Sequence, residues 1–288
     1  MKGNTWPDAY ARPATREGGE ARGTVLSPHL IVLRMERDEG LYRRLDLACS
    51  LQITSRWREA VLTDSNDLSS SVRSALSGHD AEGAPLEDPH LAFLPLGFVS
   101  HNHADGHLLG MAVALPRDLS ATDRRAVVRA LGRVRQLNLG RLGVWRLETV
   151  AESRPPWALH PEGWTAHPSG ATDWSTVTPV AFDRHPKAKG RAAYRDEVAA
   201  MLRRCCSRVG LPEPRVIVAS PVSSHAGVPP AHAFPRLERK DGSLRRHTHC
   251  ILVFESPVCG PMVLGAGRYR GYGFCRPLDG SRSVKGDS

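Results

Sequence analysis

The chain has 288 residues, and 41% of them are hydrophobic, which is enough for a buried core in about two domains. No apolar run reaches about 18 residues, and residues 1–23 lack the apolar centre of a secretory signal, so we expect no membrane-spanning helix and a cytoplasmic location. The formal net charge is +9 and arginine greatly outnumbers lysine, which favours a polyanion such as nucleic acid as the partner.

The first half of the chain begins with residues 1–26, a polar and basic segment that we expect to be a flexible tail. A short β-branched run at 29–33 predicts a strand, and the imperfect alternation at 45–53 predicts a second extended run. Thr54 is placed to cap a following helix, with apolar residues at near-helical spacing: Trp57, Val61, Leu68, Val72 and Leu76. The polar segment TDSNDLSSS is expected to interrupt that helix, and Gly78 to end it.

Two further strands are predicted at 92–99 and 108–115, with the turn signal Asp105-Gly106 in the loop between them. Ser120 begins a capping box for the next helix, whose buried face is Val127, Leu131 and Val134. A strand at 144–147 completes a β-α-β-β-α-β order. That order over residues 27–150 predicts a first ferredoxin-like domain of the α+β class.

The second half repeats part of this order. Residues 151–173 are predicted to be an ordered connector, because Trp157 and Trp164 need a surface to pack on. The second domain is predicted at 174–280, followed by a C-terminal tail at 281–288. Its expected elements are a strand at 174–182, a helix at 190–210, strands at 215–219 and 250–254, and a last strand at 273–275. A glycine-rich segment stands where a second helix would be.

That segment, GPMVLGAGRYRGYGFCRP at 260–277, is neither a P-loop nor a convincing dinucleotide fingerprint. Its glycines would let backbone N–H groups approach phosphates, and Arg268 and Arg270 would supply positive charge. Tyr269 and Tyr272 are candidates for stacking on bases. The plain alternative is a tight glycine turn that joins two strands.

The histidines are the candidates for proton transfer, since imidazole titrates near neutral pH. His79 follows Gly78 at the predicted helix end, where it would be exposed, although any single histidine can equally be an ordinary surface residue. In HNHADGH, extended backbone would put His101, His103 and His107 on one face, but the Asp-Gly turn breaks that parity and no carboxylate or cysteine pattern completes a zinc set. We therefore expect no metal site and no cofactor. The six cysteines contain no C-x-x-C pair, which is typical of reduced thiols.

Three stretches together resemble a known family: SALSGHDAEGAPLEDPHLAFLPLGFVSHNHADGHLLGMAVALPR, WSTVTPVAFDRHPK and RRHTHCILVFESPVCGPMVLGAGRYRGYGFCRP. They are similar to the CRISPR-associated RAMP-superfamily subunit of type I-U (I-G) systems, in which a backbone-capping half is fused to a repeat-RNA endoribonuclease half. The chain resembles the endoribonuclease half over most of residues 27–280. The capping half is missing, which indicates a truncated or split version.

The resemblance implies two tandem ferredoxin-like (RRM-like) domains with antiparallel sheets, helices on one face, and RNA on the face and cleft between them. It implies metal-independent cleavage of CRISPR repeat RNA by 2′-OH attack, with His79 as the first candidate for the catalytic histidine and His90 and His103 as alternates. The expected partners are the precursor or guide RNA and the other subunits of a type I interference complex. The expected RNA-binding residues are Arg245, Arg246, Gly265, Gly267, Arg268, Tyr269, Arg270, Gly271 and Gly273, and Arg245, Arg246 or Arg268 would stabilise the phosphorane.

Three alternatives remain open at this point. The first is a non-catalytic RNA-binding subunit of the same complex, and the second is a zinc-dependent hydrolase built on HNHADGH. The third is a basic globular protein without affinity for nucleic acid.

Overall fold

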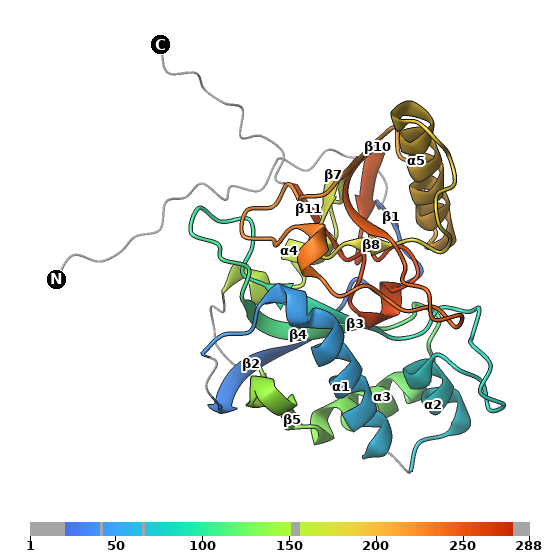
Figure 1. Cartoon of the computed structure of the whole chain (residues 1–288). Coiled ribbons are helices and arrows are strands. Elements are labelled where there is room, and N and C mark those ends of the chain that lie inside the picture. The colour runs from blue at the N-terminus through green and yellow to red at the C-terminus, as the bar shows by residue number, and fades with distance from the viewer. Residues whose placement is uncertain (1–20, 41–42, 65–66, 151–155, 279–288) are drawn as a thin grey trace.

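A computed structural model describes residues 21–40, 43–64, 67–150 and 156–278. The first domain is an antiparallel sheet with strand order β3-β4-β2-β6-β5 (Figure 1). Its strands are β2 (Ile31–Glu39), β3 (Ala92–Gly97), β4 (Leu108–Ala114), β5 (Gln136–Asn138) and β6 (Val144–Thr149). Its helices are α1 (Ser50–Thr63), α2 (Ser70–Ser77) and α3 (Ala121–Arg133). Apart from the short edge strand β5, this is the predicted ferredoxin-like arrangement, with the first strand in the centre beside the third and the fourth.

The extended run predicted at 45–53 is wrong. The chain instead forms a 3-10 turn, η1 (Leu47–Cys49), whose first turn is capped by the Asp46 carboxylate, and α1 follows directly. The reason is the helical spacing of Ile53, Trp57 and Val61, which are all fully buried. Thr54 therefore lies inside α1 and does not cap it.

The predicted helix boundaries further along are confirmed. The polar segment separates α1 from α2, and Gly78 ends α2 in the left-handed conformation at φ 68°. The Ser120 side chain accepts a hydrogen bond from the Asp123 N–H at the start of α3.

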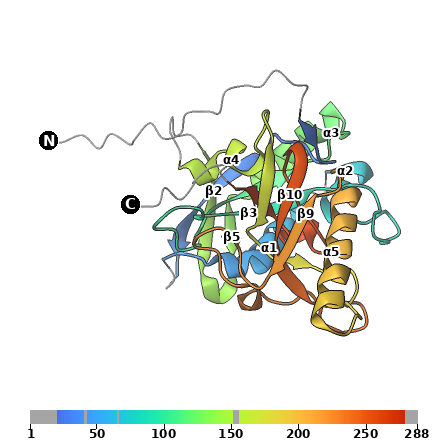
Figure 2. The same ribbon diagram turned by 90° about the horizontal axis from the view of Figure 1, so that it is seen from above.

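The second domain has the same strand order as the first. Strands β9, β10, β7 and β11 lie side by side, all antiparallel, with α5 (Arg191–Arg208) packed on one face (Figure 2). The strands are β7 (Ala171–Thr176), β9 (Val216–Ser220), β10 (His247–Cys259) and β11 (Cys275–Pro277), and the short β8 (Val180–Ala181) pairs with the start of β10. Between β10 and β11, where a ferredoxin-like domain has its second helix, the glycine-rich segment forms only the 3-10 turn η5 (Arg268–Arg270).

The chain contributes one more strand before the first domain begins. Strand β1 (Arg22–Gly23) pairs in parallel with Val258 and Cys259 of β10, and Leu26 is 1% exposed. The predicted flexible tail is therefore wrong for residues 22–26, because backbone pairing holds Arg22 and Gly23 on the second domain, and Leu26 is buried against the first domain, where it pairs with Pro116. Residues 1–20 and 279–288 lie outside the described residues.

The connector contains η3 (Trp157–Leu159) and α4 (Glu162–Thr165), while residues 151–155 fall outside the description. Trp164 is fully buried, as expected, and stacks on Phe274 with 4.9 Å between ring centroids. Trp157 is 50% exposed and stacks on His160. One tryptophan thus anchors the connector, and the other lies on its surface.

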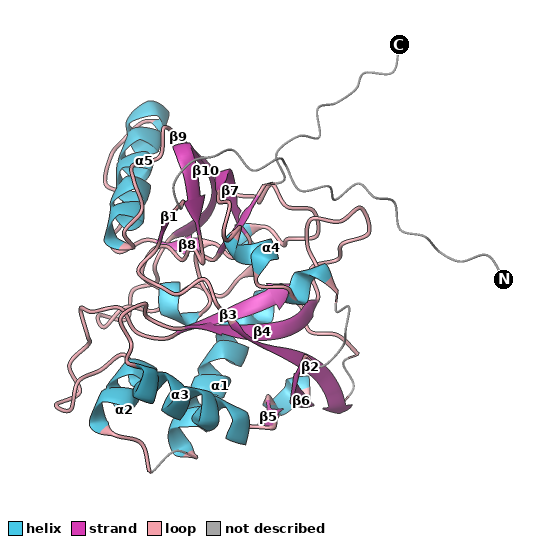
Figure 3. Ribbon diagram, turned by 180° about the vertical axis from the view of Figure 1, so that it is seen from behind, coloured by secondary structure: helices cyan, strands magenta, loops and turns pink. Residues whose placement is uncertain are grey.

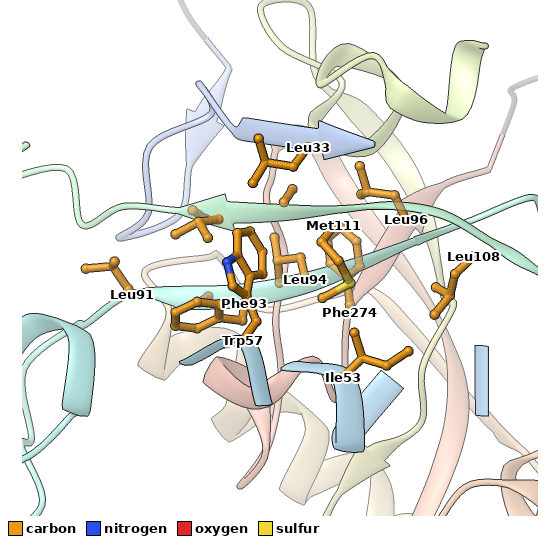
Figure 4. Close-up of a cluster of buried hydrophobic side chains, with 14 of the residues drawn as sticks. Leu33, Ile53, Trp57, Leu91, Phe93, Leu94, Leu96, Leu108, Met111 and Phe274 are labelled. Atoms are coloured by element: carbon orange, nitrogen blue, oxygen red, sulfur yellow. The ribbon is translucent and has the colours of Figure 1, made fainter. Parts of the chain in front are cut away.

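The first sheet is covered on both faces, by α1–α3 on one side and by the second domain on the other (Figure 3). For this reason every residue of β3 is buried. The two domains share one buried hydrophobic cluster, which contains Phe274 of the second domain together with Ile53, Leu94 and Met111 of the first (Figure 4). No helix in the described part of the chain is long and apolar enough to cross a membrane.

Candidate functional site

The glycine-rich segment lies between the two domains, and its glycines serve close backbone packing. A Cβ on Gly265 would come within 2.3 Å of the Ala181 carbonyl oxygen, and one on Gly273 within 2.0 Å of the Leu264 carbonyl oxygen. One on Gly267 would meet the Tyr272 side chain at 2.7 Å. Gly265, Gly267, Gly271 and Gly273 are all buried in this structure.

Tyr272 is fully buried, and its hydroxyl donates to the Pro235 carbonyl, so stacking of Tyr272 on an RNA base is wrong. Its ring packs in the shared core beside Phe234. The sequence offered both tyrosines as candidates, and only the structure shows that Tyr272 is buried.

The three residues of η5 are the part of the segment that reaches the surface. Arg270 is exposed, and Arg268 and Tyr269 are half-buried. The segment is seated on the first domain, because the Thr54 hydroxyl donates to the Arg270 carbonyl at 2.9 Å. Gly271 packs so closely on α1 that an added Cβ would lie 2.9 Å from Thr54 Cγ2.

η5 contacts one of the three candidate histidines, His90. The Tyr269 and His90 ring centroids are 3.6 Å apart, and the Arg268 guanidinium carbon lies 4.7 Å from the Tyr269 ring centroid. His90 Nε2 also lies against Gly78, where an added Cβ would be only 2.6 Å away. Gly78 therefore does more than end α2, since it makes room for the imidazole.

His79 directly follows Gly78 and is exposed, as the sequence predicted, with its Nδ1 2.9 Å from the Ser77 carbonyl. We call Arg58, His79, His90, Arg268, Tyr269 and Arg270 the junction cluster. It joins side chains of α1, of the residue that follows the α2 C-cap, of the segment that leads into β3, and of η5.

Charge and burial set the protonation of His90. Burial, together with the nearby Arg58, Arg268 and His79, lowers its pKa to about 4. Its Nδ1 lies 3.3 Å from the Asp88 carbonyl, so Nδ1 carries the proton and Nε2 is the unprotonated nitrogen. At neutral pH, His90 is thus an uncharged imidazole in a positively charged setting.

Arg58 is a member of the cluster that sequence reasoning missed. Its Nε donates to the Leu76 carbonyl at 3.1 Å, and burial and the neighbouring Arg270 both lower its pKa. The arginines at 58 and 270 come from different domains. Only the fold places two like charges side by side, and such pairs are typical of sites for anions.

His103 lies elsewhere. It is exposed in the loop between β3 and β4, at the opposite end of β3 from His90. The side chain of the nearby His107 is bonded to Asp105. Among the described residues, no group of three or more His, Cys, Asp or Glu side chains is placed to hold a metal ion, so HNHADGH does not assemble a zinc site. The six cysteines, all within the described residues, form no disulfide with one another.

Arg245 and Arg246 flank the same loop from the second domain. The Arg246 carbonyl accepts from the Phe182 N–H, and the adjacent Ala181 carbonyl accepts from Ala266 of the glycine-rich segment. Arg245 is half-buried, and its Nη1 donates to two backbone carbonyls, at Phe182 and Asp183. Arg246 is exposed. The two arginines predicted together thus differ in how freely they can meet a ligand.

A second contact between the domains lies on the hairpin side and was not predicted. Ser100 has φ 64°, and its Oγ is 2.7 Å from His225 Nδ1. His225 Nε2 faces the carbonyl oxygens of Ser175 and Arg276, both at 3.2 Å, so Nε2 carries the proton and Nδ1 accepts from Ser100. The buried Arg276 donates to the Val99 carbonyl at 2.8 Å. This contact fixes the domains on the side away from the junction cluster.

The strand orders define a protein of two ferredoxin-like domains with a cationic junction between them. The model of the family described as "CRISPR-associated protein, GSU0054 family" matches residues 39–277. The chain belongs to this family of CRISPR-associated proteins. A search of curated proteins found no match.

Several solved structures are similar over most of their length. One is described as a Cas6-related gene product from Pyrococcus furiosus. It is 11% identical in sequence, the match covers 91% of this chain and 100% of that chain, and the TM-score is 0.41. Another is described as CRISPR-associated protein Cas6. It is 9% identical, the match covers 87% of this chain and 99% of that chain, and the TM-score is 0.44. A third is described as a RAMP protein that binds different RNA substrates. It is 12% identical, the match covers 87% of this chain and 99% of that chain, and the TM-score is 0.42.

Proposed function

We propose that the chain binds CRISPR repeat RNA at the junction cluster and cleaves it without a metal ion, remaining with the guide RNA in a type I interference complex. The observation that carries the proposal is the meeting of His79 and His90 with the arginines of α1 and η5. Membership of a CRISPR-associated family supports RNA as the polyanion, and the net charge of +9 agrees with it.

The geometry divides the chemistry among named groups. Neutral His90 accepts the proton of the ribose 2′-OH at Nε2, and the 2′ oxygen then attacks the adjacent phosphorus. The bond from phosphorus to the 5′ oxygen breaks, and His79 gives that oxygen a proton. The products are a 2′,3′-cyclic phosphate and a 5′-OH. Arg268 and Arg270 stabilise the charge that builds on the phosphorane oxygens.

In this proposal the second domain holds the RNA beside the junction cluster. Arg245, Arg246 and the η5 arginines contact phosphates. The buried glycines Gly265, Gly267, Gly271 and Gly273 set the path of the loop backbone, whose N–H groups remain candidates for phosphate contacts.

The test is to incubate the protein with its repeat RNA in EDTA and to look for cyclic-phosphate ends. We expect cleavage by the wild type, at least about a hundredfold slower cleavage by His79→Ala and by His90→Ala, and RNA affinity that is unchanged in both. His103→Ala is the matched control and should cleave normally, because it lies at the other end of β3. Intact RNA with retained binding would instead favour the non-catalytic RNA-binding subunit, and a flat response of binding to salt would reject an RNA partner altogether.

A further inference from the structure

Tyr269 makes a contact that the proposed chemistry does not use. Its ring belongs to η5 of the second domain and lies against His90, which precedes β3 of the first. The ring planes are inclined at 43°, and the centroids are 3.6 Å apart, so the two rings meet over their faces. The Arg268 guanidinium also lies over the Tyr269 ring. Two side chains of the cluster therefore already occupy the aromatic surface that a base would need.

The backbone around Tyr269 is held firmly. The Arg270 N–H donates to the Gly267 carbonyl at 2.8 Å, and the Arg270 carbonyl accepts from Thr54 of α1. Arg268 Nη1 donates to the Gly265 carbonyl at 3.2 Å. The ring direction is thus set by the seating of the loop on the first domain, and His90 meets a fixed surface.

His90 is confined from the other sides as well. Its Nδ1 faces the Asp88 carbonyl, and its Nε2 lies against Gly78. The charged or titratable groups around it are Arg58 of α1, His79 after α2, and Arg268 and Tyr269 of η5. Tyr269 is the member of this set that covers the ring face.

We infer that Tyr269 is a positioning residue: its ring holds the His90 imidazole across the domain junction, so that seating of the glycine-rich loop orients the general base. This inference rests on the proposed function for its effect on rate, but not for its effect on His90 itself. It replaces the expectation that Tyr269 stacks on an RNA base. An aromatic contact of this kind contributes roughly a tenfold effect.

The experiment compares Tyr269→Leu, which removes the aromatic face, with Tyr269→Phe, which keeps it. Tyr194→Leu, a half-buried tyrosine on α5, is the control for loss of a tyrosine. The His90 resonances of isotope-labelled protein, assigned with His90→Gln, are followed by NMR as a function of pH. Cleavage rate at saturating RNA and RNA affinity are measured in parallel, each across pH.

For Tyr269→Leu we expect a changed His90 chemical shift, a His90 pKa that rises toward its ordinary value as the ring becomes solvated, and roughly tenfold slower cleavage with unchanged affinity. Tyr269→Phe and Tyr194→Leu should behave like the wild type. An unchanged His90 titration in Tyr269→Leu would overturn the inference, and so would a loss of RNA affinity without a change at His90, which would restore the base-stacking role. If the wild type fails to cleave RNA, the proposed function fails alone, since the NMR titration still decides whether Tyr269 positions His90.

Discussion

Replacing His225 with glutamine tests whether a neutral imidazole buried between the domains makes the fold sensitive to acid. His225 is 5% exposed, and burial together with the nearby Arg276 lowers its pKa from 6.5 to about 4. Above pH 6.5 the imidazole is neutral in both the folded and the unfolded chain, so its titration has no effect on stability. As the pH falls below 6.5, the unfolded chain takes up the proton first, and stability is lost progressively down to pH 4.

The magnitude follows from the two pKa values. Linkage gives a loss of about 2 kcal/mol in the free energy of unfolding at pH 5, which levels off at about 3 kcal/mol below pH 4. Glutamine does not titrate in this range, so His225→Gln should lose about 2 kcal/mol less than the wild type between pH 7.5 and pH 5. At pH 7.5 the variant itself should be less stable by about 1 to 3 kcal/mol, because the Ser100 hydroxyl loses its acceptor.

The assay is urea unfolding at pH 7.5 and pH 5.0 for the wild type and His225→Gln. His232→Gln, which removes an exposed imidazole from the same domain, is the control. The quantity compared is the loss of unfolding free energy between pH 7.5 and pH 5.0 in each protein. The contributions of the other histidines are the same in the wild type and the variant, so they cancel in this comparison. The reasoning is refuted if His225→Gln loses as much stability as the wild type on acidification.

Alanine at two glycine positions should change the stability in opposite directions. Gly273 has φ 64°, and an added Cβ would lie 2.0 Å from the Leu264 carbonyl oxygen, so Gly273→Ala should lower the free energy of unfolding by at least about 2 kcal/mol. Gly132 lies inside α3 and faces open space, so Gly132→Ala should raise it by about 0.5–1 kcal/mol. Urea unfolding measures both, and a neutral Gly273→Ala would show that the loop backbone relaxes freely. Arg270→Ala should reduce the slope of log affinity for single-stranded repeat RNA against log salt by about 0.7, the value for one lost phosphate contact, while Arg125→Ala on the exposed face of α3 should leave the slope unchanged. Equal slopes for the two variants would remove η5 from the RNA-binding surface.

The sequence by itself determined the order of elements and most of their limits. Ser120 caps the start of α3 and Gly78 ends α2 through contacts within one helical turn, and the apolar runs at 92–99 and 108–115 each belong to one strand. The repeated β-α-β-β order followed from such signals, and with it the ferredoxin-like class. The sequence also indicated the exposed His79 and the cationic η5, because exposure at a helix end and charge beside glycines are local properties. The error at 45–53 arose where an alternating and a helical pattern overlap, and burial of Ile53 and Trp57 decided for the helix.

Tertiary structure alone decided what these residues meet. Nothing near His90 in the sequence indicates that Tyr269 and Arg58 will surround it, since each comes from a different element and the contacts form only when the domains pack. The same holds for Ser100 with His225. The glycines of the loop look like phosphate-binding positions in the sequence, yet in the structure they let backbone pass against Ala181, Leu264 and α1 without side chains between. Local patterns depend on neighbours within a few residues, whereas a site at a domain junction depends on long-range packing, which the one-dimensional pattern does not contain.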